Sequence, residues 1–199
     1  MEAMRIIKDE HRALEAILHA VHYILGEIGA GRLEPDFPLL RALVDYLYAY
    51  PEQSHHPKED RYLFAPLKRR TVEGAAALAT LEREHAESEE RIASLQRALD
   101  AYVAGAADGF AGFVDAFNRY SVFYLAHLHL EEREILPLAL KHFTEEDWAE
   151  AARGFRADAD RRAGMRDAER EEEFRRLFAK LVAAAPAPIG LGAGRYDEV

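Results

Sequence analysis

Apolar residues recur at steps of three and four positions along four long stretches of this chain, and a histidine lies on each of the resulting stripes. Residues separated by three or four positions share one face of an α-helix, so each stripe predicts an amphipathic helix with its histidine on the buried side. The expected helices cover about residues 3–28, 36–63, 72–103 and 110–142. Four such helices with short connections predict an all-α fold, an antiparallel up-down-up-down four-helix bundle.

Local signals indicate where these helices begin, end and bend. Glycines at the Gly29-Ala30-Gly31 segment end the first helix. Asp36, followed by Pro38, is typical of a helix start, because aspartate caps a helix and proline is tolerated in its first turn. Pro57 lies inside the second stripe and therefore predicts a kink or a break near His55.

The C-terminal part of the chain predicts one or two additional helices. Residues 144–155 begin with a capping threonine and predict a short fifth helix. Residues 158–170 are highly charged and predict a loop or a weak helix, while residues 171–185 predict another helix. The Pro/Gly-rich residues 186–199 predict an extended tail.

Length and cysteine content limit both the organisation and the chemistry of the chain. With 199 residues the chain is long enough for one domain with its own core. We expect residues 1–157 to form the bundle with its short fifth helix, and residues 158–199 to form the charged segment, last helix and tail. The absence of cysteine excludes disulfides, thiolate zinc sites, iron–sulfur clusters and a cysteine nucleophile.

Charge and hydropathy exclude several classes of partner. The formal net charge is −10, which provides no basic surface for nucleic acid and disfavours anionic membranes. No run of eighteen apolar residues predicts a membrane span, and the N-terminus lacks the apolar run of a signal peptide. We therefore expect a cytoplasmic protein without nucleic-acid or membrane partners, for which a homodimer is a compatible assembly.

Two glutamates accompany the stripe histidines. His55 precedes Glu59 by four positions, and His127 precedes Glu131 by four, so each pair can direct an imidazole and a carboxylate at one point. A lone histidine on a stripe is usually a hydrogen-bonded core residue, but burying unpaired carboxylates costs several kcal/mol. We interpret the set as a cage for a pair of transition-metal ions, iron first. The candidate metal ligands are His11, His55, Glu59, His85, His127 and Glu131.

These residues occur in motifs that resemble the hemerythrin-like, HHE cation-binding family over about residues 3–142. The motifs are Asp9-Glu10-His11-Arg12, His55-His56-Pro57-Lys58-Glu59-Asp60 with Leu63-Phe64, Glu84-His85, and His127-Leu128-His129-Leu130-Glu131-Glu132 through Ile135-Leu136-Pro137. The resemblance implies a bundle that binds two iron ions in a non-haem di-iron centre, bridged by two carboxylates and an oxo or hydroxo group. It also implies roles for the candidate ligands: His11, His55, His85 and His127 as terminal ligands, with Glu59 and Glu131 as bridges.

Two ligand positions have alternatives. His56 lies three residues before Glu59 and could replace His55, although the four-residue spacing favours His55. Glu132 could replace Glu131, because oxygen-carrying members of the family place their acid five residues after the histidine. The four-residue spacing is the better helical match and favours Glu131.

The sequence departs from the oxygen carriers in the third helix. Those proteins supply two histidines four residues apart, whereas here Leu81 stands one turn before His85. Tyr120 and Tyr124 lie on the stripe of His127 and are candidates to coordinate or hydrogen-bond an oxygen species on iron. The alternative is that both are core aromatics with a satisfied hydroxyl. A site with fewer imidazoles is more open, which favours redox reactivity over stable oxygen carriage.

The leading functional hypothesis is a di-iron protein that binds or senses oxygen or a related small molecule, such as another diatomic or a peroxide. Two alternatives use the same centre: an enzyme acting on peroxide, oxygen or nitric oxide, and a protein of iron storage or homeostasis. A further alternative is a bundle without metal that acts through partner contacts.

Overall fold

The structure is a computed structural model that describes residues 1–162, with side chains as far as residue 156. Every element in this part of the chain is a helix. The elements are α1 (Glu2–Gly29), α2 (Phe37–Tyr50), η1 (Pro51–His55), α3 (His56–Glu59), η2 (Asp60–Phe64), α4 (Ala65–Arg70), α5 (Ala75–Val103), α6 (Gly109–Leu130), η3 (Glu131–Ile135), α7 (Leu136–His142) and α8 (Glu145–Arg162), where η denotes a π-helical segment.

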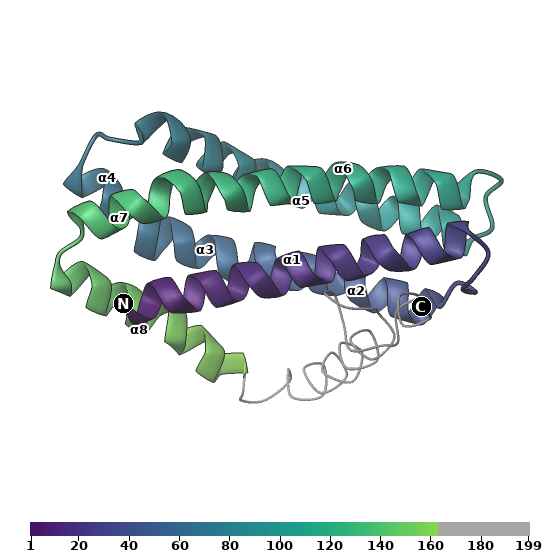
Figure 1. Ribbon diagram of the computed structural model, residues 1–199, viewed down its shortest axis with the longest axis horizontal. Coiled ribbons are helices and arrows are strands. Elements are labelled where there is room, and N and C mark those ends of the chain that lie inside the picture. Colours follow the sequence, from purple (N-terminus) through teal and green to yellow (C-terminus); the bar gives the residue numbers. More distant parts are fainter. Residues whose placement is uncertain (163–199) are drawn as a thin grey trace, which may run out of the picture.

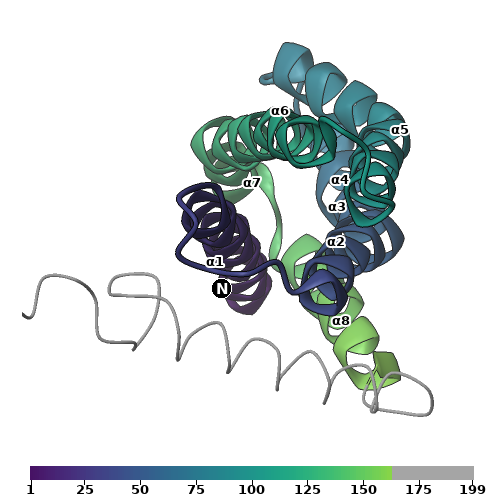
Figure 2. The ribbon, with the colours of Figure 1, turned by 90° about the vertical axis from the view of Figure 1, so that its right-hand side faces the viewer.

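The chain runs back and forth along the long axis of the molecule (Figure 1). Seen along that axis, α1, α2, α5 and α6 surround a shared interior (Figure 2). α8 packs against α1 and η2, and a Cβ at Gly154 of α8 would overlap with the ring of Tyr62. No helix in the described part of the chain combines the length and the apolar character that a membrane crossing requires.

Three of the four expected helix ranges agree with the observed bounds to within a few residues, whereas the second helical stretch continues past residue 63 to Arg70. Asp36 caps α2, because its carboxylate accepts a hydrogen bond from the backbone N–H of Leu39 at 3.0 Å. The third long helix begins at Ala75 rather than near residue 72, because Gly74 has a positive φ of 75° and cannot belong to a right-handed helix.

The C-terminal region differs from its prediction where it is described. α8 extends to Arg162 and so continues through the first residues of the charged segment that was expected to be a loop or a weak helix. The predicted helix over 171–185 and the tail from 186 lie outside the described residues.

Each π-helical segment is followed two residues later by a proline, namely Pro57 after η1, Pro66 after η2 and Pro137 after η3. A proline lacks the N–H that would bond to the carbonyl four residues earlier, and its ring clashes with that carbonyl. The fourth residue before each proline lies inside the preceding π-helical segment, where the wider turn accommodates the clash. The break expected at Pro57 is therefore a π-helical turn in a continuous helical path.

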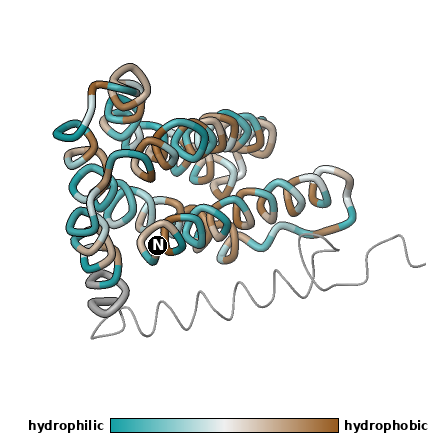
Figure 3. Tube along the Cα trace, turned by 60° about the vertical axis from the view of Figure 1, so that its left-hand side comes forward, coloured by the Kyte–Doolittle hydropathy of each residue, from teal (hydrophilic) through white to brown (hydrophobic). Residues whose placement is uncertain are grey.

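The apolar core is divided into two clusters. One contains residues such as Leu18, Leu43 and Phe117. The other contains residues such as Ile7 and Phe64, together with side chains of α8. In α1, His11 lies between Ile7 of one cluster and Leu14 of the other, so a polar layer separates the two apolar parts. Along the helices, hydrophobic and hydrophilic positions alternate, as amphipathic helices require (Figure 3).

Candidate metal centre

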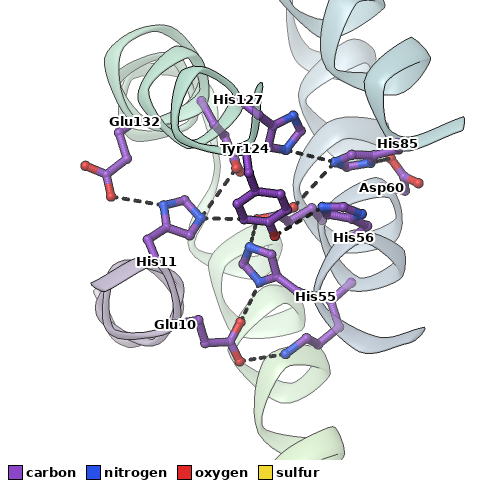
Figure 4. Close-up of polar contacts among 12 residues, drawn as sticks. Glu10, His11, His55, His56, Asp60, His85, Tyr124, His127 and Glu132 are labelled. Carbon is purple, nitrogen blue, oxygen red and sulfur yellow. Dashed lines mark hydrogen bonds and ion pairs between the residues drawn. The ribbon is translucent and has the colours of Figure 1, made fainter. Parts of the chain in front are cut away.

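The polar layer consists of imidazoles and carboxylates buried between the helices (Figure 4). Their side chains are at most 6% exposed, and the set comprises His11, His55, His56, Glu59, His85, His127 and Glu131. α1 contributes one of them, the helical path from η1 to α3 contributes three, α5 one, and the path from α6 to η3 two. Every long helical stretch of the bundle therefore contributes to one interior site.

These residues form two clusters that could each hold a metal ion. The first consists of His11, His55, Glu59 and Glu131, and the second of His56, Glu59, His85 and His127. Within each cluster, the candidate ligand atoms lie within 4.8 Å of one another. Glu59 belongs to both clusters, so its carboxylate is placed to serve two ions at once.

In the first cluster, the Nε2 atoms of two histidines converge on carboxylate oxygens. Nε2 of His55 lies 2.8 Å from Oε1 of Glu59, and Nε2 of His11 lies 3.4 Å from the same oxygen. Nε2 of His11 is also 3.5 Å from Oε2 of Glu131. Two imidazoles and two carboxylates thus face one small volume.

The second cluster is rich in imidazole. Nε2 of His85 lies 3.2 Å from Nε2 of His127 and 3.7 Å from Oε2 of Glu59. The rings of His56 and His85 stack with their centroids 4.1 Å apart. Nε2 of His56 lies 3.4 Å from the hydroxyl of Tyr124. Three imidazoles and Glu59 therefore make up the second cluster.

A carboxylate outside the clusters holds the other ring nitrogen of most of these histidines. Nδ1 of His11 donates a hydrogen bond to Glu132 at 3.0 Å, and Nδ1 of His55 donates to Glu10 at 2.8 Å. Nδ1 of His85 donates to Asp60 at 2.9 Å, and Nδ1 of His127 donates to Glu84 at 2.9 Å. Such a bond orients the ring and leaves Nε2 as the atom that faces the cluster. The histidines are thus held in the orientation that a metal ligand needs.

These bonds connect neighbouring helices. Glu10 precedes His11 in the sequence, yet it accepts from His55. Glu84 precedes His85, yet it accepts from His127. Each acid therefore supports a histidine of a different helix, and the orientation of the imidazoles depends on the packing of the bundle.

Burial and the close contacts among these groups shift the pKa values of the buried carboxylates and of His11. Burial and the neighbouring Glu59 carboxylate raise the pKa of Glu131 well above its usual value. Burial also acts to raise the pKa of Glu59, but His55 and His11 outweigh it and hold that pKa well below its usual value. For His11, burial lowers the pKa, but hydrogen bonds to Glu132 and Glu59 prevail and raise it to about 10.

The donor set fits a metal centre. Oε2 of Glu59 and both carboxylate oxygens of Glu131 are buried without a hydrogen-bond partner. Buried polar atoms in this condition cost free energy unless a bound group satisfies them. In the described part of the chain, the ion pairs of Glu59 and Glu131 are with histidines and not with a lysine or an arginine. A bound transition-metal cation would match the charge of these oxygens and the imidazole nitrogens around them.

All six metal ligands expected from the sequence lie in this site. His55 and His56 were alternatives for one position, but both face the site, one in each cluster. Glu131 belongs to the first cluster, whereas Glu132 lies on its outside, against Nδ1 of His11. Leu81 is fully buried in the apolar cluster that contains Ile7, so the structure brings His56 rather than a second residue of α5 against His85.

The two candidate tyrosines differ in position. The hydroxyl of Tyr124 reaches the second cluster at His56. The hydroxyl of Tyr120 donates to the backbone carbonyl of Leu47 at 3.4 Å, and its ring stacks on that of Tyr124. Burial raises the pKa of both phenols well above the usual value, so both are neutral hydroxyl groups.

Comparison with known proteins identifies a family whose model matches most of the chain. The model of the family described as "Hemerythrin HHE cation binding domain" matches residues 2–139, a range that contains both clusters and their outer carboxylates. No curated protein and no solved structure gives a significant match.

Proposed function

The chain belongs to the hemerythrin HHE cation-binding domain family, and on this basis we propose that it is a non-haem di-iron protein that binds or senses oxygen or a related small molecule. Its matched part would be an antiparallel up-down-up-down four-helix bundle around the metal centre. The observation that best supports two ions is the position of Glu59, which belongs to both clusters.

In this proposal each cluster holds one iron ion. His11 and His55 would bind the first ion, and His56, His85 and His127 the second. Glu59 would bridge the two ions with one oxygen each. Glu131 belongs to the first cluster, and its role as a second bridge rests on the family resemblance together with its two unpartnered oxygens.

Iron is the proposed metal because imidazole and carboxylate suit it and the chain offers no thiolate. When bound, two iron ions supply redox change and a coordination position at which a small oxygen-containing molecule can bind. The chain's own contribution is orientation and exclusion of water. Outer carboxylates hold the imidazoles, and the apolar clusters on either side limit access of solvent.

Tyr124 is the residue best situated to act on a small molecule without being a metal ligand. Its ring is buried, and its hydroxyl is the only polar atom of that side chain. We propose that it donates a hydrogen bond toward the second cluster, where it already lies 3.4 Å from Nε2 of His56. Tyr120 would support Tyr124 through ring stacking at 5.8 Å between centroids.

Metal analysis combined with an optical spectrum tests the proposal. Protein purified from iron-supplied cells is expected to contain about two iron ions per chain and to change its visible absorption on exposure to oxygen. Glu59→Gln should lose both properties, whereas His19→Ala, at an exposed position on α1, should keep them. Less than about one transition-metal ion per chain would contradict the proposal, and uptake far beyond two would favour storage.

A further inference from the structure

A hollow of about 270 Å³ lies beside the second cluster, between the η1–η2 region and α5. Residues of both elements line it, among them Glu52, His56, Asp60, Glu82, His85 and Ala86. Asp60 and Ala86 are exposed, so the hollow opens to solvent. Its inner wall contains His56 and His85, which both belong to the second cluster. A solute in the hollow therefore contacts the rings of two candidate ligands.

The remainder of the site is closed to solvent by comparison. His11, His55, Glu59 and Glu131 are each 0% exposed, whereas the side chain of His85 is 6% exposed. The second cluster is thus the part of the centre that lies nearest to water. It approaches the solvent at the hollow, which His85 lines.

Carboxylates surround this hollow. Among the residues that line it, Glu52, Asp60 and Glu82 are acidic and none is a lysine or an arginine. Two of the acids have partners, since Asp60 accepts from His85 at 2.9 Å and Glu82 pairs with Lys68. A lining of this kind attracts cations and repels anions.

Glu52 is the innermost of these acids. Its side chain is 10% exposed, and burial raises its pKa. Oε2 accepts from the hydroxyl of Ser88 and lies 3.4 Å from Nδ1 of His56. Oε1 is buried without a hydrogen-bond partner, and so is Nδ1 of His56. A buried carboxylate that has one unpartnered oxygen, and whose other oxygen lies 3.4 Å from an imidazole nitrogen, is suited to receive a cation.

We propose that this hollow is the access route by which a divalent transition-metal cation reaches the centre, with Glu52 as the carboxylate that takes it from water and His56 and His85 as the receiving imidazoles. The proposal rests on the proposed function, because it presupposes a centre to be filled. The access route and the proposed function make different predictions. The access route predicts the rate of metal uptake, whereas the proposed function predicts the final metal content.

The test is stopped-flow loading of the metal-free full-length protein with Co²⁺, whose visible absorption reports coordination. Glu52→Gln keeps the shape of the side chain but removes its charge, and it should slow loading by about threefold or more. Asp60→Asn should also slow it. Glu90→Gln removes a charge from an exposed site on α5 outside the hollow and should load at the wild-type rate.

Ionic strength provides a second measurement. The wild-type loading rate should fall as salt is raised, because screening weakens the attraction of the acidic lining for Co²⁺. The salt dependence should be smaller for Glu52→Gln. The route would be overturned if Glu52→Gln and Asp60→Asn both loaded at the wild-type rate with unchanged salt dependence.

A steric variant tests the route without a change of charge. Ala86→Trp places a large side chain at the exposed edge of the hollow and should slow loading, whereas Ala101→Trp, at an exposed position about 22 Å farther along α5, should not. Equal rates for both would contradict the route. The variants at residues 52, 86, 90 and 101 should reach the wild-type metal content at equilibrium, whereas Asp60→Asn also removes the hydrogen bond that orients His85 and is compared by loading rate alone. A wild-type protein that bound no stoichiometric metal would instead overturn the proposed function.

Discussion

His55 and His56 are adjacent in the sequence, yet each belongs to a different one of the two clusters that share Glu59. On a regular α-helix, successive residues point about 100° apart, which would turn one of the two rings away from the interior. The π-helical segment η1 ends at His55 and changes this relation locally. One short segment therefore supplies an imidazole to each of the two clusters.

The first prediction concerns the metal stoichiometry of histidine variants. His56→Ala should retain about one metal ion per chain, because only the second cluster loses a ligand. His55→Ala should likewise lose the metal of the first cluster, and Glu59→Gln should lose both. Elemental analysis after dialysis measures this, with His19→Ala as the control. Full metal content in His56→Ala would show that His56 is not a ligand.

The second prediction concerns the position at which the oxygen carriers have an additional histidine. Leu81→His should not increase metal content, because residue 81 lies in an apolar cluster and His56 already stacks on His85. It should destabilise the protein by about 1–3 kcal/mol, since an imidazole would be buried without a partner. Thermal unfolding measures the loss, with Leu81→Met as a volume-conserving control. A third metal ion or an unchanged melting temperature would contradict this prediction.

The third prediction concerns the outer carboxylates. Glu84 accepts from Nδ1 of His127 at 2.9 Å without belonging to either cluster. Glu84→Gln should weaken metal affinity about 10-fold to 100-fold while leaving the fold intact, because the orientation and basicity of His127 depend on this bond. Chelator competition measures the affinity. Glu90→Gln, on the exposed surface of the same helix, should keep the wild-type affinity.

The fourth prediction concerns the pH dependence of stability away from the centre. Asp147 accepts hydrogen bonds from Arg70 at 2.8 and 3.1 Å and from the backbone N–H of Thr144 at 2.9 Å. Burial acts to raise the pKa of Asp147, but Arg70 and Thr144 outweigh it and lower the pKa to about 2. Because this value lies below that of an unfolded aspartate, the contribution is present above about pH 4 and is lost as the pH falls toward 2.

Comparison of Asp147→Asn with the wild type measures this contribution. In metal-free protein, the variant should be less stable by about 1–2 kcal/mol at pH 7, and the difference should shrink steadily between about pH 4 and pH 2. Glu145→Gln removes a charge from the same turn of α8 and should not show this pH profile. A difference that did not change with pH would mean that Asp147 acts through packing alone.

The helical stretches and most of the site could be predicted from the sequence because both depend on local spacing. A separation of four residues brings His55 and Glu59 to one helix face, whatever the rest of the chain does. The simultaneous use of His56 could not be predicted in this way, because it depends on a π-helical turn. A proline two residues after each such turn was the available signal.

The outer carboxylates could not be predicted from local spacing, since their partners lie on other helices. Glu10 and Glu84 each stand next to a histidine in the sequence and resemble ordinary solvated residues. Only the packing of α1 against the η1–α3 path, and of α5 against α6, brings them to the histidines that they support.

The division of the apolar core into two clusters has a consequence for how the molecule unfolds. Between them lies a layer of imidazoles and carboxylates, in which several buried atoms have no hydrogen-bond partner. When the centre is filled, the ions cross-link the four helical stretches and the two parts should melt as one cooperative unit. When it is empty, the layer should transmit little stabilisation, and we expect each end of the bundle to unfold as a separate unit with its own melting transition.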